Sequence, residues 1–305
     1  MTKTVLVTGA SGRSGKHAAD AFAADGWTVR RFNRKTDDLV TAAKGADVIY
    51  NGMNPPNYHN WAENIPRITA DVIAAAKASG ATIIQPGTVY VYGDQPGVFS
   101  AGTPQRAHTR KGKIRIEMEN AFKRAARDGV QTIVLRGGDF IDPEGKGDAM
   151  EVIYLRALKK GRLTAAGDVN AVRAHCYLPD FGRAAVMLAN RRETLGAYED
   201  IPFEGHSFSV IQLKARIEWM TGQDLKLATF PWWVFRGLAP FWELARELLE
   251  MRYLWSLDHQ LDGARLAALL PDFKATDFDT IMRPLVGRSL GRSISPQLTS
   301  RPNPA

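Results

Sequence analysis

The sequence has little cysteine and no long apolar segment. Its single cysteine, Cys176, cannot form a disulfide within the chain, which fits a reducing compartment. No apolar run approaches the roughly 20 residues that a membrane-spanning helix requires. The N-terminal residues enter an apolar strand directly, without the hydrophobic region of a signal peptide. These absences predict a cytoplasmic protein without a membrane span.

Acidic residues are missing from the C-terminal end of the chain. The formal net charge of +8 suggests a nucleic-acid partner, but half of that excess lies after Asp279. The region after Asp279 contains no acid and four arginines, Arg283, Arg288, Arg292 and Arg301. Residues 286–305 are rich in Ser, Pro and Gly, which predicts a flexible basic tail. The remaining charge suits an anionic small molecule, and we expect no nucleic acid as a partner.

Short β-type runs alternate with helical segments in the first half of the chain, at residues 4–8, 27–32, 47–51, 82–85 and 132–136. This alternation predicts an α/β fold with a doubly wound parallel (Rossmann) sheet. After residue 136 the alternation loosens. We expect a dinucleotide-binding domain formed by residues 1–136 and about 171–190, and a smaller substrate domain formed by residues 137–170 and 191–285.

A glycine-rich loop, TGASGRSG, follows the first predicted strand and opens a helix. Gly9 allows a tight turn, Gly12 lets backbone N–H groups approach a pyrophosphate, and Gly15 allows close packing of helix on strand. The positive end of the helix then faces the phosphates. The alternative is a glycine-rich turn without a ligand. The predicted dinucleotide contacts in this loop are Gly9, Ser11, Gly12, Arg13, Ser14 and Gly15.

The end of the second predicted strand bears on the choice between NAD and NADP. An NAD site normally has an acid there to bind the ribose hydroxyls. This chain has Asn33 at that position, followed by Arg34 and Lys35. Arginine can bind a 2′-phosphate and stack on adenine, and Arg13 is a second candidate for the same phosphate. The alternative is a pair of solvent-exposed cations. We predict NADP as cofactor, with NAD less favoured.

With these motifs in place, the chain resembles the short-chain dehydrogenase/reductase superfamily, in the extended and atypical branch that includes NAD-dependent epimerases and dehydratases. The resemblance runs over residues 3–285 and includes Asn64, the VYG motif at 91–93 and LRGGDFIDP at 135–143. It implies that Thr88, four residues before Tyr92, is the active-site Ser/Thr.

The resemblance also implies an active-site Tyr-x-x-x-Lys pair on the helix after the fifth strand. Lys113, with Glu117 four residues later, fits the lysine position, and Thr109 then occupies the tyrosine position. In the family the lysine binds the nicotinamide ribose and lowers the pKa of the phenol, which exchanges a proton with the substrate. The chain is therefore predicted to have an atypical active site that lacks this tyrosine.

Two residues are candidate substitutes for the missing phenol. Tyr90 is expected to share one strand face with Thr88 and Tyr92, which would place it near the nicotinamide. His108 has a suitable pKa range and lies beside the vacated position. The alternatives are a tyrosine packed in the cleft and a solvated loop histidine.

The segment between Arg34 and Ala46 has room for one helix only, whereas relatives carry a third strand there. We therefore expect the sheet to lack that edge strand, with Asp38 and Leu39 near the adenine. At the end of the next predicted strand, Asn51, Gly52 and Met53 are expected to line the nicotinamide ribose. No metal site is expected, because His175 and Cys176 have no further ligands at zinc-like spacing.

Two functions remain open from the sequence. The first is an NADP-binding oxidoreductase or epimerase/dehydratase-like enzyme that acts on a small carbonyl or hydroxyl substrate. The second is a catalytically silent NADP-binding regulatory or assembly protein, which the missing tyrosine favours. The sequence leaves a homodimer open. The aromatic segment 230–255 has three interpretations, which are core packing, a pocket for an apolar substrate and contact with a membrane surface.

Overall fold

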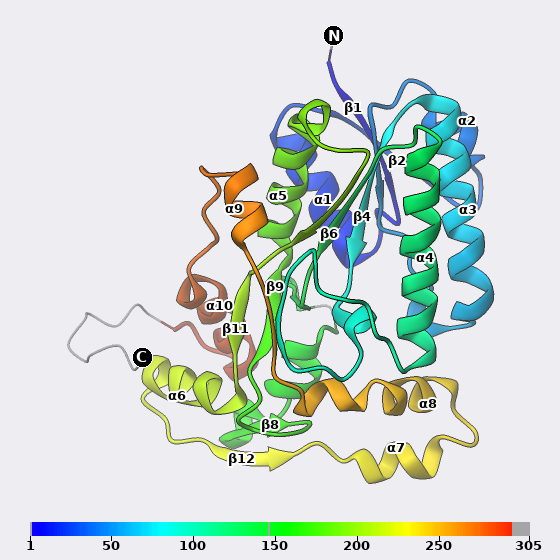
Figure 1. Ribbon diagram of the computed structural model, residues 1–305. Coiled ribbons are helices and arrows are strands. Elements are labelled where there is room, and N and C mark those ends of the chain that lie inside the picture. Colours follow the sequence, from blue (N-terminus) through cyan, green and yellow to red (C-terminus); the bar gives the residue numbers. More distant parts are fainter. Residues whose placement is uncertain (1, 146, 295–305) are drawn as a thin grey trace.

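The computed structural model describes residues 2–145 and 147–294. Its centre is a sheet of six parallel strands in the order β2-β1-β3-β4-β6-β10 (Figure 1). The strands are β1 (Thr4–Thr8), β2 (Thr28–Arg31), β3 (Val48–Asn51), β4 (Thr82–Gly87), β6 (Thr132–Arg136) and β10 (Tyr198–Pro202). The four inner strands are buried along almost their whole length, so their sequences are continuously apolar and β-branched rather than alternating.

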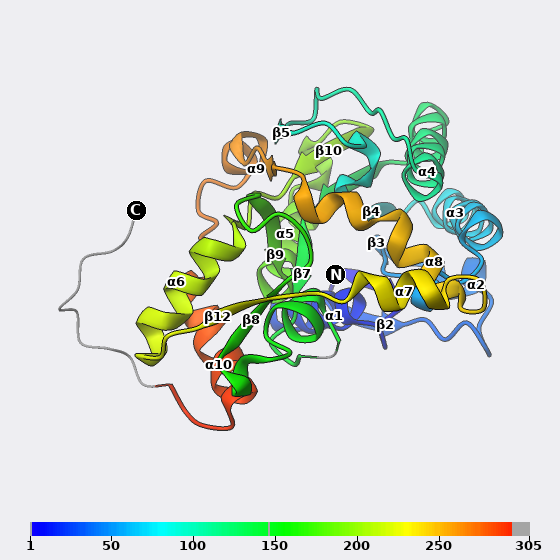
Figure 2. The ribbon, with the colours of Figure 1, turned by 90° about the horizontal axis from the view of Figure 1, so that it is seen from below.

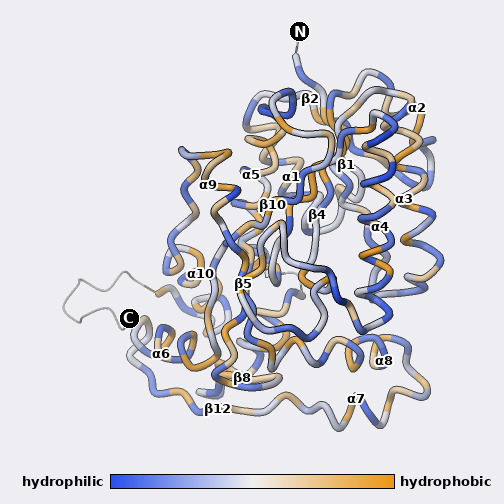
Figure 3. The backbone as a smooth tube through the Cα atoms, viewed as in Figure 1, coloured by the Kyte–Doolittle hydropathy of each residue, from blue (hydrophilic) through white to orange (hydrophobic). Residues whose placement is uncertain are grey.

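Helices cover both faces of this sheet. One face packs on α1 (Arg13–Ala24) and α5 (Leu178–Asn190), and the other packs on α2 (Leu39–Ala43), α3 (Trp61–Ser79) and α4 (Arg110–Arg127). Val5 and Val7 contact the α1–α5 side, whereas Leu6 between them joins the α3–α4 side. Hydrophobic and hydrophilic residues alternate along α3 and α4 as these helices turn (Figure 3). The predicted doubly wound parallel fold is confirmed.

The predicted absence of the third strand is also confirmed. β2 is the edge of the central sheet, and only the short helix α2 lies between β2 and β3. The expected domain boundary at residue 191 needs a correction, because β10 pairs in parallel with β6 and so belongs to the central sheet. The sequence YEDIP obscured this edge strand, since three of its five residues are half-exposed.

The remaining strands form two small sheets. The larger has the order β11-β9-β13-β5, with β7 beside β9; the smaller is the pair β8 and β12. Their bounds are β5 (Gly97–Phe99), β7 (Asp139–Ile141), β8 (Arg162–Ala165), β9 (Arg173–Tyr177), β11 (His206–Phe208), β12 (Lys226–Thr229) and β13 (His259–Leu261). The short 3-10 and π helices are η1 (Pro56–Tyr58), η2 (Val89–Tyr92), η3 (Met150–Tyr154), η4 (Leu158–Lys160), η5 (Arg192–Thr194) and η6 (Arg252–Ser256).

The C-terminal helices are α6 (Val210–Thr221), α7 (Trp232–Leu238), α8 (Glu243–Glu250), α9 (Ala264–Leu269) and α10 (Phe278–Leu290). Figures 1 and 2 show α7 and α8 side by side, beyond the carboxyl ends of the central strands. The predicted flexible tail is wrong over residues 286–290, because α10 continues to Leu290 and Val286 is fully buried. Residues 295–305 lie outside the described residues. Among those described, no helix is both long and apolar enough to cross a bilayer.

Candidate functional site

The glycine loop joins β1 to α1 with very close backbone packing. Gly9 has a φ of 63°, and a Cβ atom on it would lie 2.4 Å from the carbonyl oxygen of Gly52. A Cβ atom on Gly15 would lie 2.3 Å from the carbonyl oxygen of Gly9. Gly12 is the N-cap of α1, and Ser11 and Gly12 are exposed at the helix N-terminus. This cradle fits the pyrophosphate of a dinucleotide, because the positive end of α1 faces an exposed surface there.

Two side chains of the loop face other parts of the site. The hydroxyl of Ser14 lies 2.5 Å from that of Tyr50 on β3, which fixes α1 to the sheet. Burial raises the pKa of Tyr58 and of Asp148, and the nearby charge of Arg13 opposes the shift in both groups. Arg13 therefore lies close enough to Tyr58 and Asp148 for its charge to act on both groups.

The end of β2 presents exposed polar residues. Asn33, Arg34 and Lys35 are all exposed, and no acid occupies the Asn33 position. Sequence reasoning missed Asp37, whose carboxylate accepts a hydrogen bond of 2.8 Å from the backbone N–H of Asn33. This hydrogen bond lowers the pKa of Asp37. Asp38 caps α2 through Thr41, so its carboxylate serves the helix.

The predicted nicotinamide-ribose residues are brought to the carboxyl end of β3, but not in equal roles. Asn51 is buried and joins three strands, because its side chain accepts from Thr8 Oγ1 (3.0 Å) and donates to Gln85 Oε1 (2.7 Å). Gly52 packs on the glycine loop, and Met53 is half-buried. Asn51 therefore supports the floor of the site through its side-chain hydrogen bonds.

Helix α4 turns Lys113, the predicted active-site lysine, toward solvent. Lys113 and Glu117 are exposed, whereas Lys111, Arg115 and Glu119 are buried on the face toward the sheet. Residues two apart on an α-helix point in nearly opposite directions, so Lys113 points away from this face. Lys111, Arg115 and Glu119 keep the same four-residue spacing and are the residues of this set that lie on the buried side of α4.

Lys111 is fully buried beneath α8. Its ammonium group forms ion pairs with Glu247 and Glu250, and it lies 5.1 Å from the centre of the Tyr58 ring. The neighbouring Arg110 also binds Glu247. The basic start of α4 is thus neutralised by the acidic face of α8, and Lys111 holds α8 over the site.

Arg115 is buried without a carboxylate partner among the described residues. Its Nη2 donates to Asn54 Oδ1 at 2.8 Å, its guanidinium lies 4.5 Å from the centre of the Trp61 ring, and its Nε has no partner there. Burial lowers the pKa of Arg115. A buried guanidinium without a counter-ion is costly, so its charge is available to a ligand with negative or hydroxyl oxygens.

The expectation that Thr88, Tyr90 and Tyr92 share one strand face is wrong, because β4 ends at Gly87 and η2 follows. Thr88 is the N-cap of η2, and its Oγ1 accepts a hydrogen bond from the backbone N–H of Tyr90. The Tyr92 hydroxyl instead donates to the backbone carbonyl of Ser100.

Tyr90 faces a second tyrosine. Its hydroxyl lies 3.3 Å from the hydroxyl of Tyr58, which belongs to η1 in the loop after β3. Burial raises the pKa of both phenols above the ordinary value of 10, and the charge of Arg115 opposes the shift. Asp139, paired with Arg173, also acts on both phenols. The structure therefore brings Tyr58, Tyr90 and Arg115 into one electrostatically coupled group.

The two remaining catalytic candidates have structural partners. Thr109 is the N-cap of α4, and its hydroxyl accepts from the N–H of Gly112 at 3.1 Å. His108 lies 3.7 Å from Asp94 and packs on the Tyr253 ring. Asn64 binds the carbonyl of His59 in the first turn of α3. Among the described residues, no group of acids, histidines or cysteines is arranged to hold a metal ion.

Sequence reasoning missed Tyr58, Lys111 and Arg115. Tyr58 lay in a loop without a motif, and three residues of that loop have positive φ, Asn57, Tyr58 and Asn60. The spacing of Ile114, Met118 and Phe122 contained the information needed for α4, because Arg115 lies on the same side of a helical wheel as Met118 and Phe122.

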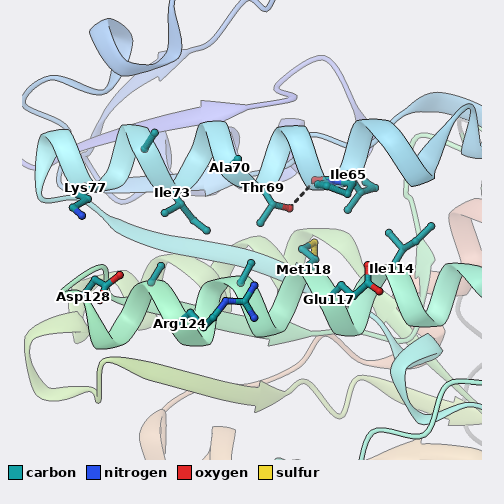
Figure 4. A pocket seen from close by; sticks show the side chains of 14 residues that line it. Ile65, Thr69, Ala70, Ile73, Lys77, Ile114, Glu117, Met118, Arg124 and Asp128 are labelled. Carbon is teal, nitrogen blue, oxygen red and sulfur yellow. Dashed lines mark hydrogen bonds between the residues drawn. The ribbon is translucent and has the colours of Figure 1, made fainter.

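A separate groove of about 760 Å³ lies between α3 and α4 (Figure 4). Its walls are mainly apolar and include Ile65, Ile73, Ile114 and Met118, while Lys77, Arg124 and Glu117 lie among them. None of the candidate catalytic residues lines this groove. The homodimer that the sequence leaves open stays a prediction.

Comparisons with known proteins place the chain. It is similar in fold to UDP-glucose 4-epimerase from Brucella ovis in complex with NAD, with 17% identity, 96% of this chain and 100% of that chain covered, and a TM-score of 0.72. It is also similar in fold to MoeE5 in complex with UDP-glucose and NAD, with 17% identity, 94% of this chain and 99% of that chain covered, and a TM-score of 0.71. A third similar structure is a putative epimerase from Burkholderia cenocepacia J2315, with 15% identity, 95% of this chain and 98% of that chain covered, and a TM-score of 0.72.

The comparison with curated proteins gave no significant match. Residues 5–201 match the family model described as "NAD dependent epimerase/dehydratase family". This match spans more than half of the chain and includes the glycine loop, η2 and α4. The chain therefore belongs to the NAD dependent epimerase/dehydratase family.

Proposed function

We propose that this chain, as a member of a family of NAD-dependent enzymes, reduces a small carbonyl substrate with NADPH. The observation that carries the proposal is the pair of hydroxyls of Tyr58 and Tyr90, 3.3 Å apart and next to the buried charge of Arg115. A phenol beside a permanent cation is the chemistry that the family's Tyr-x-x-x-Lys pair supplies. Here the phenol comes from η1 or η2 and the cation from α4.

The proposed roles follow from the protonation state of Tyr90. Burial raises the pKa of Tyr90 well above 10, so its hydroxyl is protonated at neutral pH and suited to give a proton rather than to take one. When bound, the nicotinamide supplies the hydride. Tyr90 Oη donates its proton to the substrate oxygen, and Arg115 stabilises the resulting phenolate. Tyr58 Oη then returns a proton to Tyr90 and takes up one proton from solvent. The hydroxyl of Thr88 orients the substrate oxygen.

The substrate is proposed to lie between the glycine loop and the segments 137–170 and 203–285. Helix α8, in the second of these segments, binds Arg110 and Lys111 and so covers the start of α4. Asp139 and Arg173, from the first segment and from β9, complete the polar surroundings of Tyr90.

The proton donor can be tested by substitution of Tyr90 with Phe. NADPH consumption with a panel of aldehydes and ketones should fall by about 10²–10⁴-fold in Tyr90→Phe, the usual contribution of a general acid, with NADPH affinity unchanged. Tyr92→Phe is the matched control, because Tyr92 is on the same short helix and its hydroxyl is bound to Ser100. Equal rates for Tyr90→Phe and the wild-type chain would rule out this role.

We further propose NADP as the cofactor, because Arg34 and Lys35 are exposed at the end of β2 where an acid is missing. A charge-assisted contact with a 2′-phosphate is worth about 1.5–3 kcal/mol, so calorimetry should show NADPH binding roughly ten- to hundredfold tighter than NADH. Arg34→Ala should remove most of this preference.

Asp37 provides the opposing test. Its carboxylate stands beside Asn33 at the end of the same strand. On the NADP assignment, Asp37→Asn leaves NADPH affinity unchanged or improves it, because a negative charge near the 2′-phosphate is removed. A preference for NADH that Asp37→Asn abolishes would instead identify Asp37 as the acid that binds the ribose of NAD.

The second candidate function is a non-catalytic NADP-binding protein. The observation that favours it is that Lys111, four residues before the proposed cation Arg115, is no phenol and is engaged by Glu247 and Glu250. On this alternative, NADPH binds with the affinity pattern described above, but no carbonyl compound is reduced and Tyr90→Phe has no effect on any measured rate. We also propose a cytoplasmic location, since the single cysteine is free and buried.

A further inference from the structure

An unusual concentration of exposed apolar side chains lies on α7 and on the turn that joins it to α8. Trp233 is 75% exposed and Phe241 is 91% exposed, and Leu238 and Trp242 are each 42% exposed. These four make up half of the large apolar side chains that are exposed among the described residues. Such clusters on a protein surface mark sites of contact with a partner or with a membrane.

The segment that presents these side chains is firmly held. Trp232, next to Trp233, is buried, and its indole N–H donates to the carbonyl of Ala166 at 2.5 Å. Trp242 stacks on Phe235 with ring centres 5.9 Å apart. The side chain of Arg246 donates to the carbonyl of Ala239, which closes the turn. The exposed side chains therefore project from a built structure.

The acids of this segment are engaged, whereas two of its arginines are exposed. Residues 231–242 contain no acid, and Arg236 and Arg246 are exposed beside the aromatic residues. The three acids of α8 all pair with cations of other elements: Glu243 binds His59, Glu247 binds Arg110 and Lys111, and Glu250 binds Lys111. Arg246 lies within one turn of Glu243 and also acts on its carboxylate. The exposed side chains of the segment are thus mainly aromatic and basic. We name the surface that they form the hairpin surface and define it by Trp233, Arg236, Leu238, Phe241, Trp242 and Arg246.

From this arrangement we infer that the hairpin surface binds the interface of an anionic lipid bilayer. Trp and Phe insert at the level of the lipid headgroups, and arginines beside them attract anionic lipids. The hairpin is outermost on this side of the chain, with α7 beyond α8 (Figures 1 and 2), so no other described element stands in front of it.

One consequence concerns the candidate site. The inner side of α8 contacts the start of α4 and the loop of η1, which carry Lys111 and Tyr58. Binding at the hairpin surface therefore places the covering helix of the site directly above the bilayer. The inference itself does not depend on the proposed reductase activity.

The test is sedimentation of the full chain with vesicles of phosphatidylcholine, either alone or with about one third phosphatidylserine. The wild-type chain should bind the anionic vesicles and be released by high salt, because the arginine contribution is screened. The double variant Trp233→Ser with Phe241→Ser should bind at least about tenfold more weakly. Arg236→Gln and Arg246→Gln should each weaken binding about fivefold, the loss of one cation near an anionic surface.

Val98→Ser is the matched control, since Val98 is 61% exposed on β5, outside the hairpin surface, and its loss should leave vesicle binding unchanged. Thermal unfolding of each variant verifies that the fold is intact. Equal sedimentation of the double variant and the wild-type chain would overturn the inference, and so would equal binding to neutral and anionic vesicles. Concentration-dependent self-association that Phe241→Ser abolishes, without vesicle binding, would show instead that a second copy covers this surface.

Discussion

At the scale of single residues, Arg115 is the most informative side chain of the site. It is buried, its Nε lacks a partner, and no carboxylate among the described residues pairs with it. We propose that Arg115, rather than Lys113, is the cation of α4 that binds the nicotinamide ribose. A guanidinium can donate to ribose hydroxyls as a lysine does. Unlike a lysine, it stays cationic even when it is buried.

Substitution of Arg115 should therefore weaken cofactor binding, whereas substitution of Lys113 should not. Arg115→Ala is expected to cost about 1–3 kcal/mol in NADPH affinity by calorimetry, the loss of a charge-assisted hydrogen bond. Lys113→Ala removes a cation from the opposite side of α4, where the side chain is exposed, and should change the affinity little. A loss confined to Lys113→Ala would restore the register that the sequence first indicated.

The sequence of α4 is compatible with two registers of the Tyr-x-x-x-Lys pattern. Two glutamates, Glu117 and Glu119, each follow a cation by four residues, so a Lys-x-x-x-Glu pattern fits at either Lys113 or Arg115. Residue spacing alone does not distinguish Lys113 from Arg115, because each is followed by a glutamate about one helical turn later. The apolar stripe that includes Met118 and Phe122 separates them, since only Arg115 lies on its side of the helix.

At the scale of secondary-structure elements, α8 is fastened to the rest of the molecule by its acids. Glu247 is buried and pairs with Arg110 and Lys111, whereas Glu243 pairs with His59 near the surface. A buried charge that loses its partner is costly, while an exposed pair contributes little. The contrast between these two glutamates on one helix provides an internal control.

Glu247→Gln is therefore expected to lower the free energy of unfolding by about 1–3 kcal/mol, because the fully buried Lys111 keeps only Glu250 as an ionised partner. Urea denaturation followed by circular dichroism measures this loss. Glu243→Gln makes the same chemical change at the exposed pair and should alter the stability much less. A comparable loss in both variants would mean that helix propensity, rather than the buried pair, accounts for the effect.

Most elements of the central sheet were predictable because buried parallel strands have continuous apolar sequences. This holds for β1, β3, β4 and β6, which are almost wholly buried. It fails for β10, an edge strand with half-exposed Tyr198, Glu199 and Asp200. It also fails after Gly87, where alternating Thr88, Tyr90 and Tyr92 suggest a strand but the side chain of Thr88 caps a 3-10 helix.

At the scale of the whole molecule, a buried polar network joins three strands of the second sheet to η3. Arg173 of β9 pairs with Asp139 of β7 and donates to the Tyr154 hydroxyl at 3.0 Å. His175 lies 3.3 Å from the same hydroxyl and stacks on Phe208, with ring centres 3.9 Å apart. These contacts cross several segments that are distant in sequence, so the sequence alone did not indicate them.

This network makes the stability of the molecule depend on pH. Burial lowers the pKa of His175 from 6.5 to about 3, and it also lowers the pKa of His206 and His259. Between about pH 6.5 and 3 the unfolded chain therefore binds a proton that the folded chain excludes at His175. Stability should be fully present above pH 6.5 and fall as the pH decreases, by up to about 1.4 kcal/mol for each pH unit at this one group.

Urea denaturation at about pH 7 and pH 5, a range in which most carboxylates stay ionised, measures this dependence. The wild-type chain should lose about 2 kcal/mol at His175 alone, with His206 and His259 adding in the same direction. Asp148 and Asp200, whose pKa is raised by burial, act in the opposite direction but equally in every variant. His175→Gln should therefore be less stable at pH 7 yet lose about 2 kcal/mol less on acidification.

His108→Gln, at a half-exposed histidine, is the matched control. The same pH dependence in His175→Gln and the wild-type chain would mean that His175 titrates alike in the folded and unfolded states, against its burial between Tyr154 and Phe208.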